Sequence, residues 1–239
     1  ANLRALLRPG RKAVYFTTGY GETPEKETTL VRDLLKQQNI EVSNLDMGAG
    51  EEIPADATAL VICGPKEEFK PEALARLKAY LERGGRVLAL LDPVLPAQGY
   101  ARKESKLNAV FEPYGLKVRQ DYLTRCFRPA VMGAPVPIEY VPGMPAKQHD
   151  AQELNSHILD TLIQSRQAAA FPAACLLEPV KPSKADYKST PILQSVPFKS
   201  REVDLLCWAD PAGLAEMRKA PGADSLEGPV TLAALSEPA

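Results

Sequence analysis

The sequence lacks the residue patterns that hold metals and redox centres. Its four cysteines (Cys63, Cys126, Cys175 and Cys207) stand far apart, which excludes a CxxC redox pair and a short-spaced zinc knuckle. The interpretation we favour for all four is buried thiols acting as small hydrophobes, although their even number permits disulfides. The only histidines, His149 and His157, are eight residues apart, about two helical turns, too far for joint ligation without a bend. We predict no metal site and no cofactor.

The sequence also lacks an excess of one charge and a long apolar run. Its net charge is −1 with acids and bases interspersed, which excludes the basic stripe that nucleic acid requires. The longest apolar run, residues 168–177, is about half the roughly 20 residues of a membrane span and contains Pro172. No signal peptide is visible. The sequence starts at Ala1 without a methionine, so we expect a fragment excised from a longer protein.

The first third of the chain alternates between strand and helix patterns. A Thr23-Pro24 start predicts a helix with Leu30, Val31, Leu34 and Leu35 on one face, and Pro71 opens a second helix. Apolar strands are predicted at residues 13–18, 40–46, 58–64 and 86–93, then a helix at 107–114 and a strand at 116–123. Continuous apolar strands joined by helices predict an α/β fold, a flavodoxin-like parallel sheet covered on both faces.

The second half is rich in proline and irregular. Residues 128–147 contain five prolines and are predicted to form an extended surface excursion. A helix at 151–164 and strands near residues 168–179 and 228–237 are expected to follow, with Pro172 indicating an edge strand or a bulge. We predict a flavodoxin-like core at residues 1–125, with residues 126–239 packing on it or completing the same domain.

Three turns are predicted to lie on one rim of the sheet, because open parallel sheets bind ligands outside the carboxyl ends of their strands. They follow the first, third and fourth strands. The candidate ligand-binding residues are Gly19, Tyr20, Gly21, Glu22, Gly64, Pro65, Asp92 and Pro93. The competing interpretation is that the glycines and prolines only form turns and that Asp92 caps a loop.

Two kinds of chemistry are disfavoured at this rim. The first turn lacks the Lys-Ser/Thr of a phosphate-binding loop, and the nearby carboxylates of Glu22, Glu25 and Glu27 would repel an anion. Cys63 stands at a strand end, where a nucleophile could pair with His149 or His157. A nucleophile elbow needs glycine two positions before and two positions after the nucleophile. Around Cys63 these positions are Val61 and Pro65, so we predict no catalytic residue.

The motifs together resemble a known family. "VYFTTGYGE", "IPADATALVICGP" and "LKAYLERGGRVLALLDP", followed by "LNAVFEPYGLKV", "NSHILDTLIQSRQAAAFPAACLL" and "GPVTLAALSE", are similar to the GldG-like auxiliary proteins of ABC transporters. The resemblance covers most of residues 14–237. This chain has His157-Ile158 where the family often has His-Pro, which puts any role of that dipeptide in doubt.

The resemblance implies a function and a location. Such proteins are held by membrane helices at both ends, with this region outside the cytoplasm, and accompany an ABC permease and ATPase. Their fold is similar to class I glutamine amidotransferase-like and ThuA-like proteins and to an N-terminal domain of an intraflagellar transport protein. We expect a non-enzymatic, membrane-anchored, periplasmic domain that binds a sugar, a peptide or partner subunits. The alternatives are a ThuA-like or amidotransferase-like hydrolase and a pure protein–protein scaffold.

An extracytoplasmic location bears on the cysteines. It would make Cys126, Cys175 and Cys207 candidates for disulfides. Cys63, on a central strand, is not a candidate.

Overall fold

The chain forms two units in the computed structural model, which describes residues 12–93, 105–129, 136–146, 169–171, 174–196, 205–211 and 220–238. Contacts between residues separate unit 1, Ala1–Leu91, from unit 2, Asp92–Ala239. This division comes earlier than the predicted boundary after residue 125, which falls inside a strand of the second unit, Leu116–Arg128.

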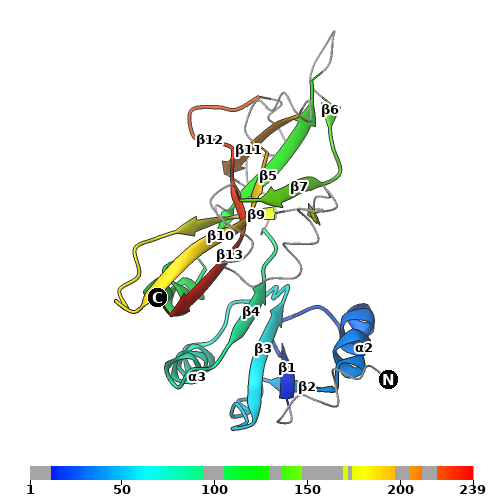
Figure 1. Cartoon of the computed structure of the whole chain (residues 1–239), viewed down its shortest axis with the longest axis vertical. Helices are drawn as coiled ribbons and strands as arrows, with labels where there is room; N and C mark the ends of the chain where they lie inside the picture. The colour runs from blue at the N-terminus through cyan, green and yellow to red at the C-terminus, as the bar shows by residue number, and fades with distance from the viewer. Residues whose placement is uncertain are drawn as a thin grey trace. The chain divides into compact units, whose positions relative to one another are not determined.

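The described part of unit 1 contains a four-stranded parallel sheet. Its strands are β1 (Lys12–Thr18), β2 (Ile40–Asp46), β3 (Ala57–Cys63) and β4 (Val87–Leu90), in the order β2-β1-β3-β4 (Figure 1). The register places Phe16 of β1 beside Val61 of β3, and Val61 beside Leu88 of β4. The four predicted strands of the first third are therefore confirmed, with ends shifted by a few residues.

Two helices lie on opposite sides of this sheet (Figure 1). Helix α3 (Pro71–Glu82) begins at Pro71 as predicted and buries Ala73, Leu77 and Tyr80. The Tyr80 hydroxyl donates a hydrogen bond to the Ala57 carbonyl at 3.2 Å, which fixes α3 to the start of β3. Because side chains alternate along a strand, the fully buried Leu60 and Ile62 of β3 lie on the opposite face from Val61.

The other helix, α2 (Thr29–Gln37), packs differently from the prediction. A 3-10 turn, η1 (Glu25–Glu27), occupies the predicted helix start. Only Leu35 of the four predicted apolar residues packs on the sheet, while Leu30 is 72% exposed. Arg32 is buried instead, with Nε donating to Thr28 Oγ1 at 2.8 Å and its guanidinium 4.0 Å from the centre of the Phe16 ring. A satisfied, stacked guanidinium thus takes the place that the periodicity assigned to leucines.

The described part of unit 2 is built of antiparallel strands. One sheet has the order β13-β10-β7-β8 and the other β12-β11-β5-β6, with β9 also pairing with β5. A short helix, α4 (Asn108–Phe111), and a 3-10 turn, η2 (Glu112–Tyr114), precede Gly115, whose φ of +88° lets the chain turn into β5. The strands are β5 (Leu116–Arg128), β6 (Val136–Pro137), β7 (Val141–Pro145), β8 (Ala169–Phe171), β9 (Ala174–Pro179), β10 (Tyr187–Ser195), β11 (Leu206–Pro211), β12 (Leu226–Glu227) and β13 (Thr231–Pro238).

The predicted fold class is wrong. The chain is mostly β with antiparallel sheets and is not a flavodoxin-like or class I glutamine amidotransferase-like parallel sandwich. Among the described residues, parallel pairing is confined to β1–β4. The physical reason lies in the strands after β4. The sequence of β5, LKVRQDYLTRCFR, mixes polar with apolar residues and is not a continuous apolar run, which suits antiparallel pairing rather than a strand buried between two helix layers.

The proline-rich segment is also more ordered than predicted. Within residues 128–147, β7 lies between β10 and β8 in its sheet and buries Val141, Pro142 and Gly143. A surface excursion is therefore wrong for this strand. Strands β8 and β9, on either side of Pro172, belong to different sheets. Pro172 and the predicted helix at 151–164 lie outside the described residues.

Candidate functional site

The GYGE turn after β1 is held by a close approach of two backbones. Gly19 has a φ of +99°, and a Cβ added there would lie 2.5 Å from the Gly48 nitrogen. Gly48 in turn allows no side chain, because its Cβ would lie 2.7 Å from the Gly19 oxygen. The two glycines let the loops after β1 and β2 touch, so Gly19 is required by packing as well as by its dihedral angle.

Tyr20 is a core residue rather than an exposed ligand contact. It is 2% exposed, and its ring stacks on Phe69 at 4.2 Å between ring centres. Its hydroxyl accepts a hydrogen bond from the Lys70 backbone N–H at 3.3 Å, just before α3 begins. The aromatic face and the hydroxyl of this predicted ligand-binding residue are thus both used inside the protein.

The structure brings the turns after β1 and β3 together. The Tyr20 carbonyl accepts hydrogen bonds from the backbone N–H groups of Lys66 and Glu67 at 3.0 and 2.9 Å. The Thr23 N–H donates to the Cys63 carbonyl at 2.8 Å, so the Gly64-Pro65 turn is joined to both ends of the GYGE segment. Gly21 belongs to the same contact, since a Cβ added there would lie 3.2 Å from Lys66 Cβ.

Glu22 closes its own turn. Its Oε2 accepts a hydrogen bond from the Tyr20 backbone N–H at 2.7 Å. Its Oε1 is buried and has no hydrogen-bond partner in the part of the chain that the structure describes. This oxygen is a buried acceptor of the turn that a small cation or a donor group could use.

Asp92 and Pro93 fall in unit 2. The Asp92 backbone carbonyl accepts a hydrogen bond from Gln120 Nε2 at 2.8 Å, which ties the segment after β4 to β5. Within unit 1 the structure brings together Gly19–Glu22 and Gly64–Pro65 of the candidate residues, and there Tyr20 is buried and the two turns are hydrogen-bonded to each other.

Cys63 ends β3 as an ordinary strand residue. It pairs in register with Leu90 and packs, half-buried, against the cluster of Val14, Phe16 and Val61. The two candidate partners, His149 and His157, lie outside the described residues. Within the described ranges, no group of three metal-binding side chains occurs, and no helix is long and apolar enough to cross a membrane.

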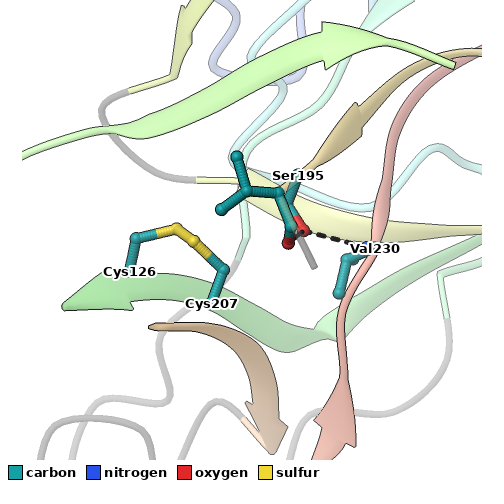
Figure 2. Close-up of a disulfide and its surroundings, with 5 residues drawn as sticks. Cys126, Ser195, Cys207 and Val230 are labelled. Carbon is teal, nitrogen blue, oxygen red and sulfur yellow. Dashed lines mark hydrogen bonds between the residues drawn. A yellow bond between two sulfur atoms is a disulfide. The ribbon is translucent and has the colours of Figure 1, made fainter. Parts of the chain in front are cut away.

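A disulfide joins two of the three cysteines that an extracytoplasmic location made candidates. Cys126 of β5 and Cys207 of β11 are directly opposite in the antiparallel register, with Cα atoms 4.2 Å apart (Figure 2). The bond lies in the core of unit 2 with Val196 and Val230, beside Ser195, whose Oγ accepts the Val230 N–H at 2.9 Å. Cys63 and Cys175 are the two cysteines outside this disulfide.

The other free cysteine, Cys175, is inert. Burial raises the pKa of its thiol to about 12, so the thiolate is not populated near neutral pH. Of the two cysteines outside the disulfide, Cys63 is half-buried and Cys175 is buried.

An apolar surface remains uncovered on unit 1, on the sheet face that α2 occupies. Leu88 and Leu90 of β4 share this face with Val61 and Cys63, because paired residues of neighbouring parallel strands point the same way. We call the following residues of unit 1 together the open face: the exposed Leu30, Val31 and Leu34 of α2, the exposed Leu88 and Leu90 of β4, and the half-buried Cys63. The sequence analysis missed it because it assigned the leucines of α2 to the core. The apolar residues of α2 form a set that is wider than one sheet-facing stripe and is interrupted by Arg32. This pattern was the signal that could have revealed the open face.

Substituting Tyr20 separates a structural role from a binding role. We expect Tyr20→Ala to lower the free energy of unfolding of unit 1 by about 3–5 kcal/mol, as large-to-small changes of buried aromatic residues do. Tyr20→Phe keeps the Phe69 stack and loses only the bond to Lys70, so it should cost about 1 kcal/mol. Urea unfolding followed by circular dichroism measures both. Equal stability of wild type and Tyr20→Ala would contradict the buried position.

Comparison with known proteins gives a family and a fold. No curated protein matches the chain. Among solved structures, the mmIFT52 N-terminal domain is similar, with a TM-score of 0.52 and 19% sequence identity over 83% of this chain and 78% of that chain. At this identity the likeness shows the fold alone. The family described as ABC-type uncharacterized transport system matches residues 11–238, which confirms the predicted resemblance. The chain belongs to this family of auxiliary proteins of ABC-type transport systems.

Proposed function

We infer that this chain is a non-enzymatic, extracytoplasmic domain that binds partner subunits of its ABC transport system through the open face of unit 1. The observation that carries this proposal is the exposure of five large apolar side chains on one helix and one edge strand. Leu88 and Leu90 are 53% and 49% exposed although their strand neighbour Val61 is 6% exposed. Contiguous apolar surface rimmed by polar residues is typical of protein interaction sites.

The rim also supports partner binding, because it lacks the features that a small-ligand site needs. A sugar or peptide site needs free donors, acceptors and a stacking face, and here Tyr20 is buried while its carbonyl already accepts two hydrogen bonds. The family membership supports a partner within an ABC transport system. We propose that this partner is the permease–ATPase complex.

The Cys126–Cys207 disulfide supports an extracytoplasmic location. Structural disulfides persist in oxidising compartments such as the periplasm and are rare in the cytosol. This bond is in the core of unit 2, where Cys126 and Cys207 are 2% and 0% exposed, so we expect reductants to reach it slowly. Membrane anchoring through helices beyond these residues is part of the proposal and rests on the family alone.

A second candidate function, ligand binding at the rim, is favoured by one observation. The buried Oε1 of Glu22 lacks a partner among the described residues, as an acceptor awaiting a cation or an N–H donor would. Thermal unfolding of the chain against sugars, short peptides and divalent cations tests this function, with Glu22→Gln as the variant. A stabilisation lost in Glu22→Gln would favour it over partner binding.

Co-elution with the purified permease–ATPase complex of the same system tests the main proposal. We expect the chain to move to the elution volume of the detergent-solubilised complex and to remain there at micromolar concentration. The compound panel should leave the melting temperature unchanged. Elution of the chain alone at every concentration tested would contradict partner binding.

A further inference from the structure

We propose that this chain forms a symmetric dimer through the edge of its parallel sheet, by antiparallel pairing of strand β4 with β4 of a second copy. The inference goes beyond the proposed function, because it needs no partner subunit. The two functions of the strand are compatible. The two-fold axis of such a dimer is perpendicular to the sheet, so the open faces of both copies lie on the same side, where a partner subunit would meet both.

Strand β4 lies at one end of the sheet order β2-β1-β3-β4 (Figure 1). The carbonyls of Arg86 and Leu90 accept backbone hydrogen bonds from the β3 side, at 2.9 and 2.8 Å. Because the backbone groups of a strand point alternately to either side, Val87 and Ala89 direct their N–H and C=O groups away from β3. Among the described residues, β4 pairs with β3 alone. The outward backbone groups of β4 therefore match a further strand.

The opposite edge of the sheet, β2, is protected in a way that β4 is not. The Asp46 N–H donates to Glu51 Oε2 at 2.7 Å, and the Asp46 carbonyl accepts the Glu51 N–H at 3.1 Å. The loop after β2 thus occupies that edge, and Glu41 places a charge within the strand. The sequence of β4, VLAL, contains neither a charge nor a proline, which are devices that keep an edge strand from pairing. Of these two edges, β4 is the one suited to pairing.

Self-pairing of β4 has one register that uses every outward group of the strand. Opposite residues of an antiparallel pair either exchange both of their hydrogen bonds or exchange none. Val87 opposite Ala89 of the second copy lets both residues of each strand exchange both bonds. The two-fold axis then passes beside Leu88, which lies opposite Leu88 of the second copy. This pair is of the non-hydrogen-bonded kind, in which the Cα atoms are about 4.5 Å apart.

The side chains of this register favour a second copy as the occupant. The exposed Leu88 meets its own counterpart, and the exposed Leu90 lies opposite Arg86, whose apolar stem can pack along it. Arg86 is the only charged residue of the segment 85–91, so no charge faces a like charge across the axis. The interface is small, and we expect a dimer that dissociates on dilution.

Cross-linking tests the register. The background is Cys63→Ser, because Cys63 lies beside Leu90 in the pairing of β3 with β4, and Cys175 is buried. In this background the variant Leu88→Cys is oxidised with diamide and run on a non-reducing gel. The two introduced thiols are related by the two-fold axis, with Cα atoms within the range of a disulfide, so we expect a covalent dimer.

The matched control is Leu90→Cys in the same background, at a similarly exposed leucine of the same strand. Its two copies are displaced along the strands by roughly 13 Å, too far for a disulfide, so we expect at least about tenfold less covalent dimer. No dimer from Leu88→Cys, or equal dimer from both variants, would overturn the proposal. A strand of another protein or another segment of this chain on β4 would give that result.

Ala89→Pro provides a second measurement that needs no introduced thiol. The Ala89 N–H faces away from β3, so proline should be tolerated in the single chain, as it is on edge strands, while the dimer loses this donor. Light scattering of the wild type should show the mass rising from one chain toward two with concentration. The variant should keep the mass of one chain and an unchanged circular dichroism spectrum. Equal masses of the two proteins at every concentration would contradict pairing through β4.

The dimer and the proposed function can fail separately. Loss of the dimer would leave the affinity of the single chain for the permease–ATPase complex to be measured as before. Failure of the chain to bind that complex would contradict the proposed function and leave the cross-linking result intact.

Discussion

Breaking the Cys126–Cys207 disulfide is expected to lower the free energy of unfolding of unit 2 by about 2–5 kcal/mol. The bond joins residues 81 positions apart, so its loss frees a long loop in the unfolded chain. The surrounding core of Val141, Leu176 and Val230 stays apolar when the bond is replaced by two alanines. Calorimetry of Cys126→Ala/Cys207→Ala measures the effect as a lower melting temperature of one transition.

A matched control exists in Cys63. Cys63→Ala removes a half-buried thiol from unit 1 and should leave the transition of unit 2 unchanged. Reducing the wild type should lower its melting temperature to that of the double variant. The reductant should leave the melting temperature of the double variant unchanged. Identical melting of wild type and double variant in the absence of reductant would contradict the bond.

Trp208→Ala is expected to destabilise unit 2 by about 3–5 kcal/mol. Trp208 is 1% exposed and stacks on Phe127, with 4.5 Å between ring centres and 8° between ring planes. Its Nε1 donates to Asp210 Oδ2 at 2.7 Å, and the other oxygen of this buried carboxylate takes a short hydrogen bond from Ser225 Oγ. The substitution removes both the stack and one donor of the carboxylate.

Trp208→Phe separates the two contributions. It keeps an aromatic ring on Phe127 and loses the donor, so it should cost about 1–3 kcal/mol. Leu226→Ala, at an exposed position of β12, is the control and should stay within about 0.5 kcal/mol of wild type. Trp208 is the only tryptophan, so its substitution removes the tryptophan fluorescence. Guanidinium unfolding is therefore followed by circular dichroism. A Trp208→Ala variant as stable as Leu226→Ala would contradict the packing.

The first third of the fold could be predicted because local signals agree there. Continuous apolar runs, Pro71 at a helix start and paired glycines after α3 all indicate the same elements, and β1–β4 and α3 are confirmed. The fold class of the second half could not be predicted. Its strands pair across long separations, such as β5 with β11 and β10 with β13, and such pairings leave no local trace in the sequence.

The candidate site was predicted only in part, for an identifiable reason. Periodicity locates which turns follow strands, and the structure does join Gly19–Glu22 to Gly64–Pro65. It says nothing about which way a side chain points, so Tyr20 could not be recognised as a partner of Phe69. Periodicity likewise gives no sign that Arg32 is buried, which a ring beneath it and acceptors beside it allow.

The affinity of the chain for its permease–ATPase complex, measured with open-face variants, tests the central claim most directly. The measurement compares wild type with Leu88→Asp/Leu90→Asp, and uses Leu226→Asp as a control at an exposed leucine of unit 2. All three should melt at the same temperature, because the substituted side chains are exposed. The account predicts at least about tenfold weaker binding for the double variant, since carboxylates would have to be desolvated at the interface, and unchanged binding for the control. Equal affinity of all three proteins for the complex would contradict the assignment of the open face as the partner-binding surface.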